Sequence, residues 1–287
     1  MSKFTKLLSK VTLVVLAAGS LSSVATSAHA ATAVQVAAPN GNPEFIKNTS
    51  NGPAGYYGDL IKRIDKDLPQ YKFNVTFTSQ NSVFTGLQSG KYDVALNNSW
   101  YNSSRFKNYY HTRATSLDDV RIIYRKNSKQ ASYLKNATSL KPVATHHLSM
   151  VPLATDDALY TVVKSYNQTH SPKVDLKPFG DQSTSDALGQ VASGKYDVTM
   201  YPYAAFEEVK NTKDGQKLAV SKSIYLKSAY LLLHKSPKNK KLTQALNREI
   251  DHLYKTGYLR QLNKKYIHED TFSFPGANKA YNAEFNK

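Results

Sequence analysis

The sequence contains no cysteine and few acidic residues for its size. Its 287 residues include 38 Lys and Arg against 21 Asp and Glu, and only one tryptophan. The absence of cysteine excludes a disulfide framework, a thiolate metal site, a cysteine nucleophile and a lipid anchor attached through cysteine. The shortage of acidic side chains leaves a formal net charge of +17. A surface this basic favours anionic partners, although the charge alone does not identify them.

Local motifs of the common enzyme classes are also missing. The chain has no Gly-x-Ser-x-Gly elbow, no phosphate-binding loop and no dinucleotide fingerprint. Its histidines are scattered, and the adjacent pair His146-His147 would point to opposite faces of a strand. A pair of catalytic carboxylates leaves no local signature, so that type of site stays open. We expect no metal, no cofactor and no enzymatic activity.

Residues 1–30 have the pattern of an export signal. Three lysines within the first ten residues precede an apolar run over 11–18, and Ala28-His29-Ala30 fits the small-x-small cleavage rule. The run is shorter than the ~20 residues that span a bilayer, and no later run approaches that length. A buried N-terminal helix is the alternative interpretation. We predict a secreted, soluble protein that carries no lipid and is found at the cell surface.

The remaining chain alternates between strand and helix patterns, and its length suggests two domains. Apolar or alternating residues predict strands over 34–38, 72–78 and 94–96. Helical spacing of apolar residues predicts helices over 59–68, 82–88, 158–166, 242–253 and 259–266, with a loose tail from residue 274 onward. This alternation argues for the α/β class, with helices covering a parallel sheet.

One hexapeptide occurs twice. Ser89-Gly-Lys-Tyr-Asp-Val94 returns as Ser193-Gly-Lys-Tyr-Asp-Val198, 104 residues later. Each copy follows a helical stretch and precedes an apolar one, which indicates a helix ending at glycine, a turn and a strand. The repeat predicts two lobes of similar build, although Gly-Lys-Tyr-Asp is also ordinary turn chemistry.

Three stretches resemble solute-binding proteins of polar amino-acid ABC transporters. The first is Gly55-Tyr-Tyr-Gly-Asp-Leu-Ile61 with Leu68-Pro-Gln-Tyr-Lys72, similar to the cystine-type branch. The second is Gly86-Leu-Gln-Ser-Gly-Lys-Tyr-Asp93 followed by Asn97-Asn-Ser-Trp-Tyr-Asn-Ser-Ser-Arg105. The third, over 242–270, resembles the closing pattern of that family. The basic, cysteine-free form also resembles non-lipidated cystine-binding surface proteins of Gram-positive bacteria.

The resemblance implies a two-lobed, periplasmic-binding-protein-like fold of type II. Residues 31–115 and 227–287 would form the first lobe, and residues 116–226 the second. Two strand-like hinge crossings would join the lobes, and a ligand in the cleft between them would bring about closure. The implied partners are a small-molecule amino-acid ligand and an ABC permease in the membrane, and the implied state is a monomer. Cystine is among the candidate ligands.

The resemblance also indicates which residues would bind the ligand. Arg105 matches the family's arginine for the substrate α-carboxylate, which a guanidinium grips with two parallel hydrogen bonds. Asn98 fits a small polar position, whereas Trp100 replaces the usual serine or threonine and could stack on the ligand, close the cleft or pack in the core. Asn97 is a weaker candidate, because polar turn residues explain it equally well. Tyr56 could supply an aromatic surface.

Two family positions are occupied by unexpected residues. Gly41 stands where the family often has a stacking aromatic, and Pro202 stands where it commonly has the aspartate that binds the substrate ammonium. Thr155, Asp156 and Asp157 could replace that acceptor, but they fit helix N-capping equally well. Tyr201 could line the cleft or lie on the surface. These departures put a standard α-amino-acid ligand in doubt.

Other functions compete with capture of an amino acid. A basic adhesin could be retained electrostatically on anionic cell-wall polymers, alone or together with transport. An enzyme on the same fold stays open, because fold does not determine function. We expect no nucleic-acid partner, because no nucleic-acid-binding module accompanies the charge and export argues against one.

Overall fold

The computed structural model describes residues 30–40, 45–155, 157–180 and 182–283. The predicted signal peptide falls on residues 1–29 outside this part of the chain, apart from Ala30. Gly41 and Asp156 also lie outside the described residues. Within the described part, no helix is both long and apolar enough to cross a membrane.

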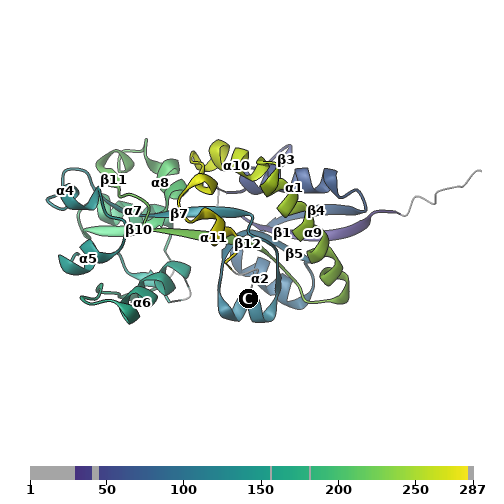
Figure 1. Ribbon diagram of the computed structural model, residues 1–287, viewed down its shortest axis with the longest axis horizontal. Helices are drawn as coiled ribbons and strands as arrows, with labels where there is room; N and C mark the ends of the chain where they lie inside the picture. The colour runs from purple at the N-terminus through teal and green to yellow at the C-terminus, as the bar shows by residue number, and fades with distance from the viewer. Residues whose placement is uncertain (1–29, 41–44, 156, 181, 284–287) are drawn as a thin grey trace, which may run out of the picture. The chain divides into compact units, whose positions relative to one another are not determined.

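Strands and helices alternate along the described chain (Figure 1). The strands are β1 (Thr32–Pro39), β2 (Lys47–Thr49), β3 (Gly52–Ala54), β4 (Tyr71–Thr78), β5 (Val94–Trp100), β6 (Tyr110–His111), β7 (Ser116–Arg125), β8 (Leu153–Ala154), β9 (Pro178–Phe179), β10 (Val198–Pro202), β11 (Leu218–Val220) and β12 (Tyr225–Leu233). The α-helices are α1 (Tyr56–Asp67), α2 (Gln80–Ser89), α3 (Ser103–Asn108), α4 (Ala131–Leu134), α5 (Lys141–Thr145), α6 (Ala158–Thr169), α7 (Thr184–Ala192), α8 (Tyr203–Val209), α9 (Pro237–Lys255), α10 (Tyr258–Leu262) and α11 (Ala277–Tyr281).

One mixed sheet runs through the described residues. Its strands follow the order β10-β7-β12-β5-β1-β4, with β11 added to β7 and β6 to β12. Strand β1 pairs in parallel with β4 and β5, whereas β12 pairs antiparallel with β5 and β7. The predicted parallel sheet is therefore correct for β4, β1 and β5 only. The antiparallel strands β7 and β12 lie side by side and connect this parallel part to β10 (Figure 1).

The repeated hexapeptide folds as predicted in both copies. Helix α2 is followed by Gly90 at φ 77° and then by β5, and helix α7 is followed by Gly194 at φ 85° and then by β10. Both turns need the left-handed backbone conformation that glycine adopts without steric cost.

The aspartate of each copy binds a neighbouring segment. The carboxylate of Asp93 accepts a hydrogen bond from the backbone N–H of Gln35 in β1 at 2.8 Å. The carboxylate of Asp197 accepts one from the backbone N–H of Ser149 at 2.9 Å. In both copies, the aspartate of the repeat therefore accepts a backbone N–H from a neighbouring segment, which agrees with the predicted similarity of build of the two lobes.

Two large apolar clusters lie along the sheet. The first contains buried residues of β1, α1, β5, α9 and α10. The second contains buried residues of β7, α6 and β10, and Trp100 from the end of β5 also belongs to it. Strand β7 contributes Leu117 to the first cluster and Val120 to the second. This strand is therefore shared by the two cores.

The prediction of a loose tail from residue 274 is wrong for the described residues. Helix α11 follows a turn at Gly276, and Tyr281 is 1% exposed. The ring of Tyr281 stacks on Tyr254 with centroids 3.8 Å apart, and the Arg113 guanidinium lies 4.6 Å from its centroid. Burial of this aromatic surface against residues far away in sequence orders a segment that has no strong pattern of its own.

Candidate functional site

The end of β5 carries three of the residues that the sequence predicts to bind ligand. Asn97 is buried and Asn98 is half-buried, and Trp100 is 8% exposed. The Asn97 side chain donates to the Gln80 side chain at 3.2 Å and accepts from the backbone N–H of Asn98 at 2.8 Å. Trp100 therefore packs in the core in this structure, one of the alternatives that the sequence left open.

Asp118 on β7 joins Asn98 to Trp100. The Asp118 carboxylate accepts hydrogen bonds from Asn98 Nδ2 and from Trp100 Nε1, each at 2.5 Å. Asp118 is 1% exposed, and Lys227 lies directly opposite it in the register of β7 and β12. The sequence patterns did not point to this residue. The available signal was an acidic pair, Asp118-Asp119, directly before the apolar-rich stretch Val120-Arg-Ile-Ile-Tyr124.

Tyr57 at the start of α1 extends the same network. Its hydroxyl donates to Asn98 Oδ1 at 2.8 Å, and the hydroxyl of Ser116 donates to the same oxygen at 3.2 Å. Burial, reinforced by the charge of Asp118, raises the pKa of Tyr57 well above its ordinary value. Tyr57 therefore stays a neutral donor at physiological pH, and the amide of Asn98 is held from three sides.

Tyr56 lies next to this network but has no exposed surface. Its hydroxyl donates to the backbone carbonyl of Thr115 at 2.6 Å, and its ring meets that of Tyr57 edge to face at 5.3 Å. In the described conformation the ring is part of the first core and does not offer a face to a ligand. The predicted aromatic surface therefore has to come from another side chain.

Arg105 lies in the first turn of α3. The Asn102 side chain caps this helix and accepts a hydrogen bond from the backbone N–H of Arg105 at 3.1 Å. The guanidinium of Arg105 lies over the ring of Phe84, 4.7 Å from its centroid, and the residue is half-buried. A guanidinium can stack on an aromatic face and form hydrogen bonds along its edge at the same time, so this contact is compatible with a planar acceptor such as a carboxylate.

The residues proposed to replace the ammonium acceptor lie at the start of α6. Asp157 caps that helix, and its carboxylate accepts from the backbone N–H of Leu159 at 2.8 Å. Thr155 is exposed, and Asp156 is outside the described residues. Helix capping explains the contact between Asp157 and the backbone N–H of Leu159, and capping is the alternative to ligand binding that the sequence left open.

Tyr201 lies on the other side of the sheet from Trp100 and Asp118. It pairs with Arg121 in the antiparallel register of β10 and β7. Directly opposed residues project to the same face, and neighbours separated by an odd number of positions project to opposite faces. The structure therefore brings Asn98 and Trp100 together at Asp118. Tyr201 projects from the Arg121 face of the sheet, although it also packs against the apolar cluster that contains Trp100.

A second polar cluster occupies the Arg121 side of β7. Arg121 Nε donates to Asp119 at 2.6 Å, and its Nη2 donates to Glu269. Its guanidinium also lies over the ring of Tyr203, 4.2 Å from the centroid. Burial, with the nearby charge of Asp119, raises the pKa of Glu269 to about 7 although Arg121 opposes the shift.

Two oxygens of these acids are buried and meet no N–H or O–H donor in the described part of the chain. They are Asp119 Oδ1 and Glu269 Oε2. Asp119 and Glu269 both accept from the Arg121 guanidinium, and the charge of Asp119 favours the protonated form of Glu269. The arrangement is therefore a pair of buried acids around a single guanidinium, that of Arg121.

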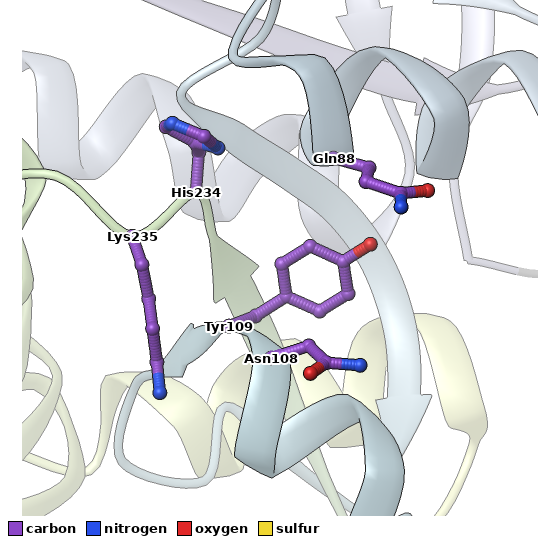
Figure 2. Close-up of a pocket in the computed structure, with 5 residues that line it drawn as sticks. All are labelled: Gln88, Asn108, Tyr109, His234 and Lys235. Atoms are coloured by element: carbon purple, nitrogen blue, oxygen red, sulfur yellow. The ribbon is translucent and has the colours of Figure 1, made fainter.

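The two pockets that stand out in the described structure lie elsewhere. One, of about 350 Å³, is lined by Gln88, Asn108, Tyr109, His234 and Lys235, with the Tyr109 ring at its centre (Figure 2). The other, of about 390 Å³, lies between the start of β12 and α11. Neither contains a predicted site residue. Within the described ranges, no three His, Asp or Glu side chains gather as metal ligands.

Comparisons with known proteins agree with the resemblance found in the sequence. The model of the family "bacterial extracellular solute-binding proteins, family 3" matches residues 34–269. The L-cystine-binding protein TcyJ of Bacillus subtilis is 26% identical over 217 residues, which cover 75% of this chain and 76% of TcyJ.

Solved structures share the fold. The probable amino-acid ABC transporter extracellular-binding protein ytmK from Bacillus subtilis superposes with a TM-score of 0.69 at 18% identity, covering 84% of this chain and all of ytmK. A chain described with glutathione import via GshT and the cystine ABC importer TcyBC of Streptococcus mutans gives 0.68 at 20% identity, covering 87% and 99%. The predicted type II, two-lobed α/β fold is confirmed. The chain belongs to the bacterial extracellular solute-binding proteins of family 3.

Proposed function

We propose that this protein captures a polar amino acid outside the cell and delivers it to an ABC permease, with cystine as the first candidate. The observation that carries the proposal is the family match over residues 34–269, together with the similarity to TcyJ over three quarters of both chains. The function consists of binding and release and requires no catalytic step.

Arg105 is the proposed partner of the ligand carboxylate. Its position at the start of α3, five residues after Trp100, supports this role, as does the stacking of its guanidinium on Phe84. Asn97, Asn98 and Trp100 would surround the bound ligand. Thr155, Asp156, Asp157 and Tyr201 remain proposed contacts from the second lobe, and Tyr56 remains one only if its ring becomes exposed.

Closure of two lobes is the proposed mechanism. The division into residues 31–115 with 227–287 and residues 116–226 is supported by the separate apolar clusters around β1 and around β10. Strands β7 and β12 cross between these clusters and would act as the hinges. A permease could then distinguish the closed, ligand-bound form from the open one.

Calorimetric titration of the protein lacking residues 1–30 tests the proposal. L-Cystine and a panel of single amino acids are added to the wild type, to Arg105→Lys and to Arg105→Ala. We expect saturable binding of one ligand, weakened by Arg105→Lys because lysine cannot form the two parallel bonds of a guanidinium. Arg260→Ala is the matched control, since Arg260 is exposed and pairs with Asp270 at 2.6 Å. Absence of binding across the panel would overturn the proposal, and unchanged binding by Arg105→Ala would exclude the assigned role of Arg105.

Electrostatic retention on anionic wall polymers is a second candidate function, favoured by a formal net charge of +14 (35 − 21) without the three lysines of residues 1–30. Adhesion and transport are compatible in one molecule. Retention by charge alone should be lost in concentrated salt, because the Debye length falls from ~10 Å at 0.1 M to ~3 Å at 1 M. Protein that stays on intact cells through a 1 M salt wash would contradict this candidate.

A further inference from the structure

The buried carboxylate of Asp118 on β7 contacts two of the predicted ligand residues, Asn98 and Trp100, at the end of β5. It accepts hydrogen bonds from the amide of Asn98 and from the indole N–H of Trp100, both at 2.5 Å. An indole has a single donor, and a buried carboxylate is among the strongest acceptors it can meet. The bond therefore determines the direction in which the Trp100 ring points.

The same network fixes the amide of Asn98. Its oxygen accepts from the hydroxyls of Tyr57 and Ser116, at 2.8 and 3.2 Å, while its nitrogen donates to Asp118. Three segments far apart in sequence, α1, β5 and β7, thus converge on one amide. Each polar group of Asn98 has a defined partner, so that the side chain cannot rotate without breaking several bonds.

We propose that Asp118 is a positioning residue of the solute site, which orients Trp100 and Asn98 for the ligand through its buried carboxylate. This inference rests on the proposed function. Asp118 is 1% exposed, so it acts through Asn98 and Trp100, which it holds, and it also accepts a longer bond from Ser116 at 3.5 Å. Because Asp118 belongs to β7, a change in that hinge strand is transmitted to the indole and the amide together.

A first test uses the wild-type protein. Trp100 is the only tryptophan of the chain, so the indole region of a ¹⁵N–¹H NMR spectrum contains one signal. We expect this indole N–H to exchange slowly with solvent and to shift on titration with L-cystine or the amino acid that binds. Exchange as fast as that of a free indole would overturn the proposal without any substitution.

The second test compares Asp118→Asn with Asp119→Asn. The two residues are adjacent on β7 and both are buried, at 1% and 0% exposed, but Asp119 contacts Arg121 on the opposite face. In Asp118→Asn, one neutral carbonyl oxygen replaces the carboxylate that served two donors. We expect a shifted tryptophan emission maximum and at least about tenfold weaker ligand binding, which corresponds to the loss of one charge-assisted hydrogen bond. Asp119→Asn should leave the emission maximum unchanged.

The outcomes separate this inference from the proposed function. If the wild type binds no amino acid, the proposed function fails, and the indole exchange rate and the emission maxima still decide whether Asp118 orients Trp100. If the wild type binds a ligand and Asp118→Asn binds it with the same affinity, the positioning role fails and the proposed function stands. Equal losses of affinity in both variants would mean a general structural effect and would also overturn the inference.

Discussion

Replacing Glu269 by Gln should make the protein more stable at alkaline pH and change little at acidic pH. Glu269 is one of the two buried acids that contact Arg121, and its side chain is 14% exposed. Burial raises its pKa from 4.5 to about 7. The folded state therefore holds a proton over a range in which the unfolded chain has already released it.

The sign and the size of the pH effect on the free energy of unfolding follow from this difference between the folded and unfolded states. Below pH 4.5 the Glu269 carboxyl is protonated in both the folded and the unfolded state, so it does not lower the free energy of unfolding there. As pH rises from 4.5 to about 7, the native state binds more protons than the unfolded state, so the free energy of unfolding falls; above 7 the loss is complete. At 1.36 kcal/mol per pKa unit, the rise of the Glu269 pKa from 4.5 to about 7 amounts to about 3 kcal/mol as an upper bound.

Glutamine mimics the protonated side chain. Its amide N–H can donate to Asp119 and its carbonyl can accept from Arg121. We expect Glu269→Gln to exceed the wild type in the free energy of unfolding by up to about 3 kcal/mol at pH 8, and to differ little near pH 5.

Urea unfolding followed by circular dichroism at pH 5, 6, 7 and 8 measures the difference. Glu208→Gln is the control, since Glu208 is 44% exposed and 3.7 Å from Lys47. A difference between Glu269→Gln and wild type that stays constant from pH 5 to pH 8 would refute the reasoning.

Two further predictions concern packing. Gly86→Ala should lower the free energy of unfolding by about 1–3 kcal/mol, because a Cβ there would lie 2.3 Å from the Tyr92 ring. The control is Gly180→Ala, where a Cβ would meet no atom within 4 Å. Equal thermal midpoints for the two variants would contradict the predicted clash. Tyr281→Ala should cost about 3–5 kcal/mol, because it removes a buried ring stacked on Tyr254. An unchanged urea midpoint would show that α11 adds nothing to the core.

Local features were predictable from the sequence. The helix-glycine-strand turn of the repeat was found because Gly90 and Gly194 act through the backbone of their own segment. Strand β4 was found because its alternation needs no knowledge of a partner. In contrast, β7 and β12 were not assigned as strands, since their place in the sheet depends on pairing between residues about a hundred positions apart.

The site was predictable to a smaller extent. The family pattern led to Asn98, Trp100 and Arg105, because their order along the chain follows a known motif. It did not lead to Asp118, because the proposed role of Asp118 depends on its hydrogen bond from Trp100. Trp100 lies eighteen residues earlier, on a strand that β12 separates from β7. It also suggested Tyr56 as an aromatic surface, although the packing of α1 turns that ring into the core. Contacts between distant segments decide these roles, and a linear pattern does not contain them.

Strand β7 carries two adjacent aspartates whose side chains serve opposite faces of the sheet. Asp118 meets Trp100 on one face, and Asp119 meets Arg121 on the other. A slip of one residue in this strand would exchange the two acids and reverse every side chain between the two cores. Pairing with β12 on one edge and with β10 and β11 on the other opposes such a slip. Insertions or deletions within residues 116–125 should therefore be far less tolerable than substitutions, and variation in length should be confined to the loops on either side.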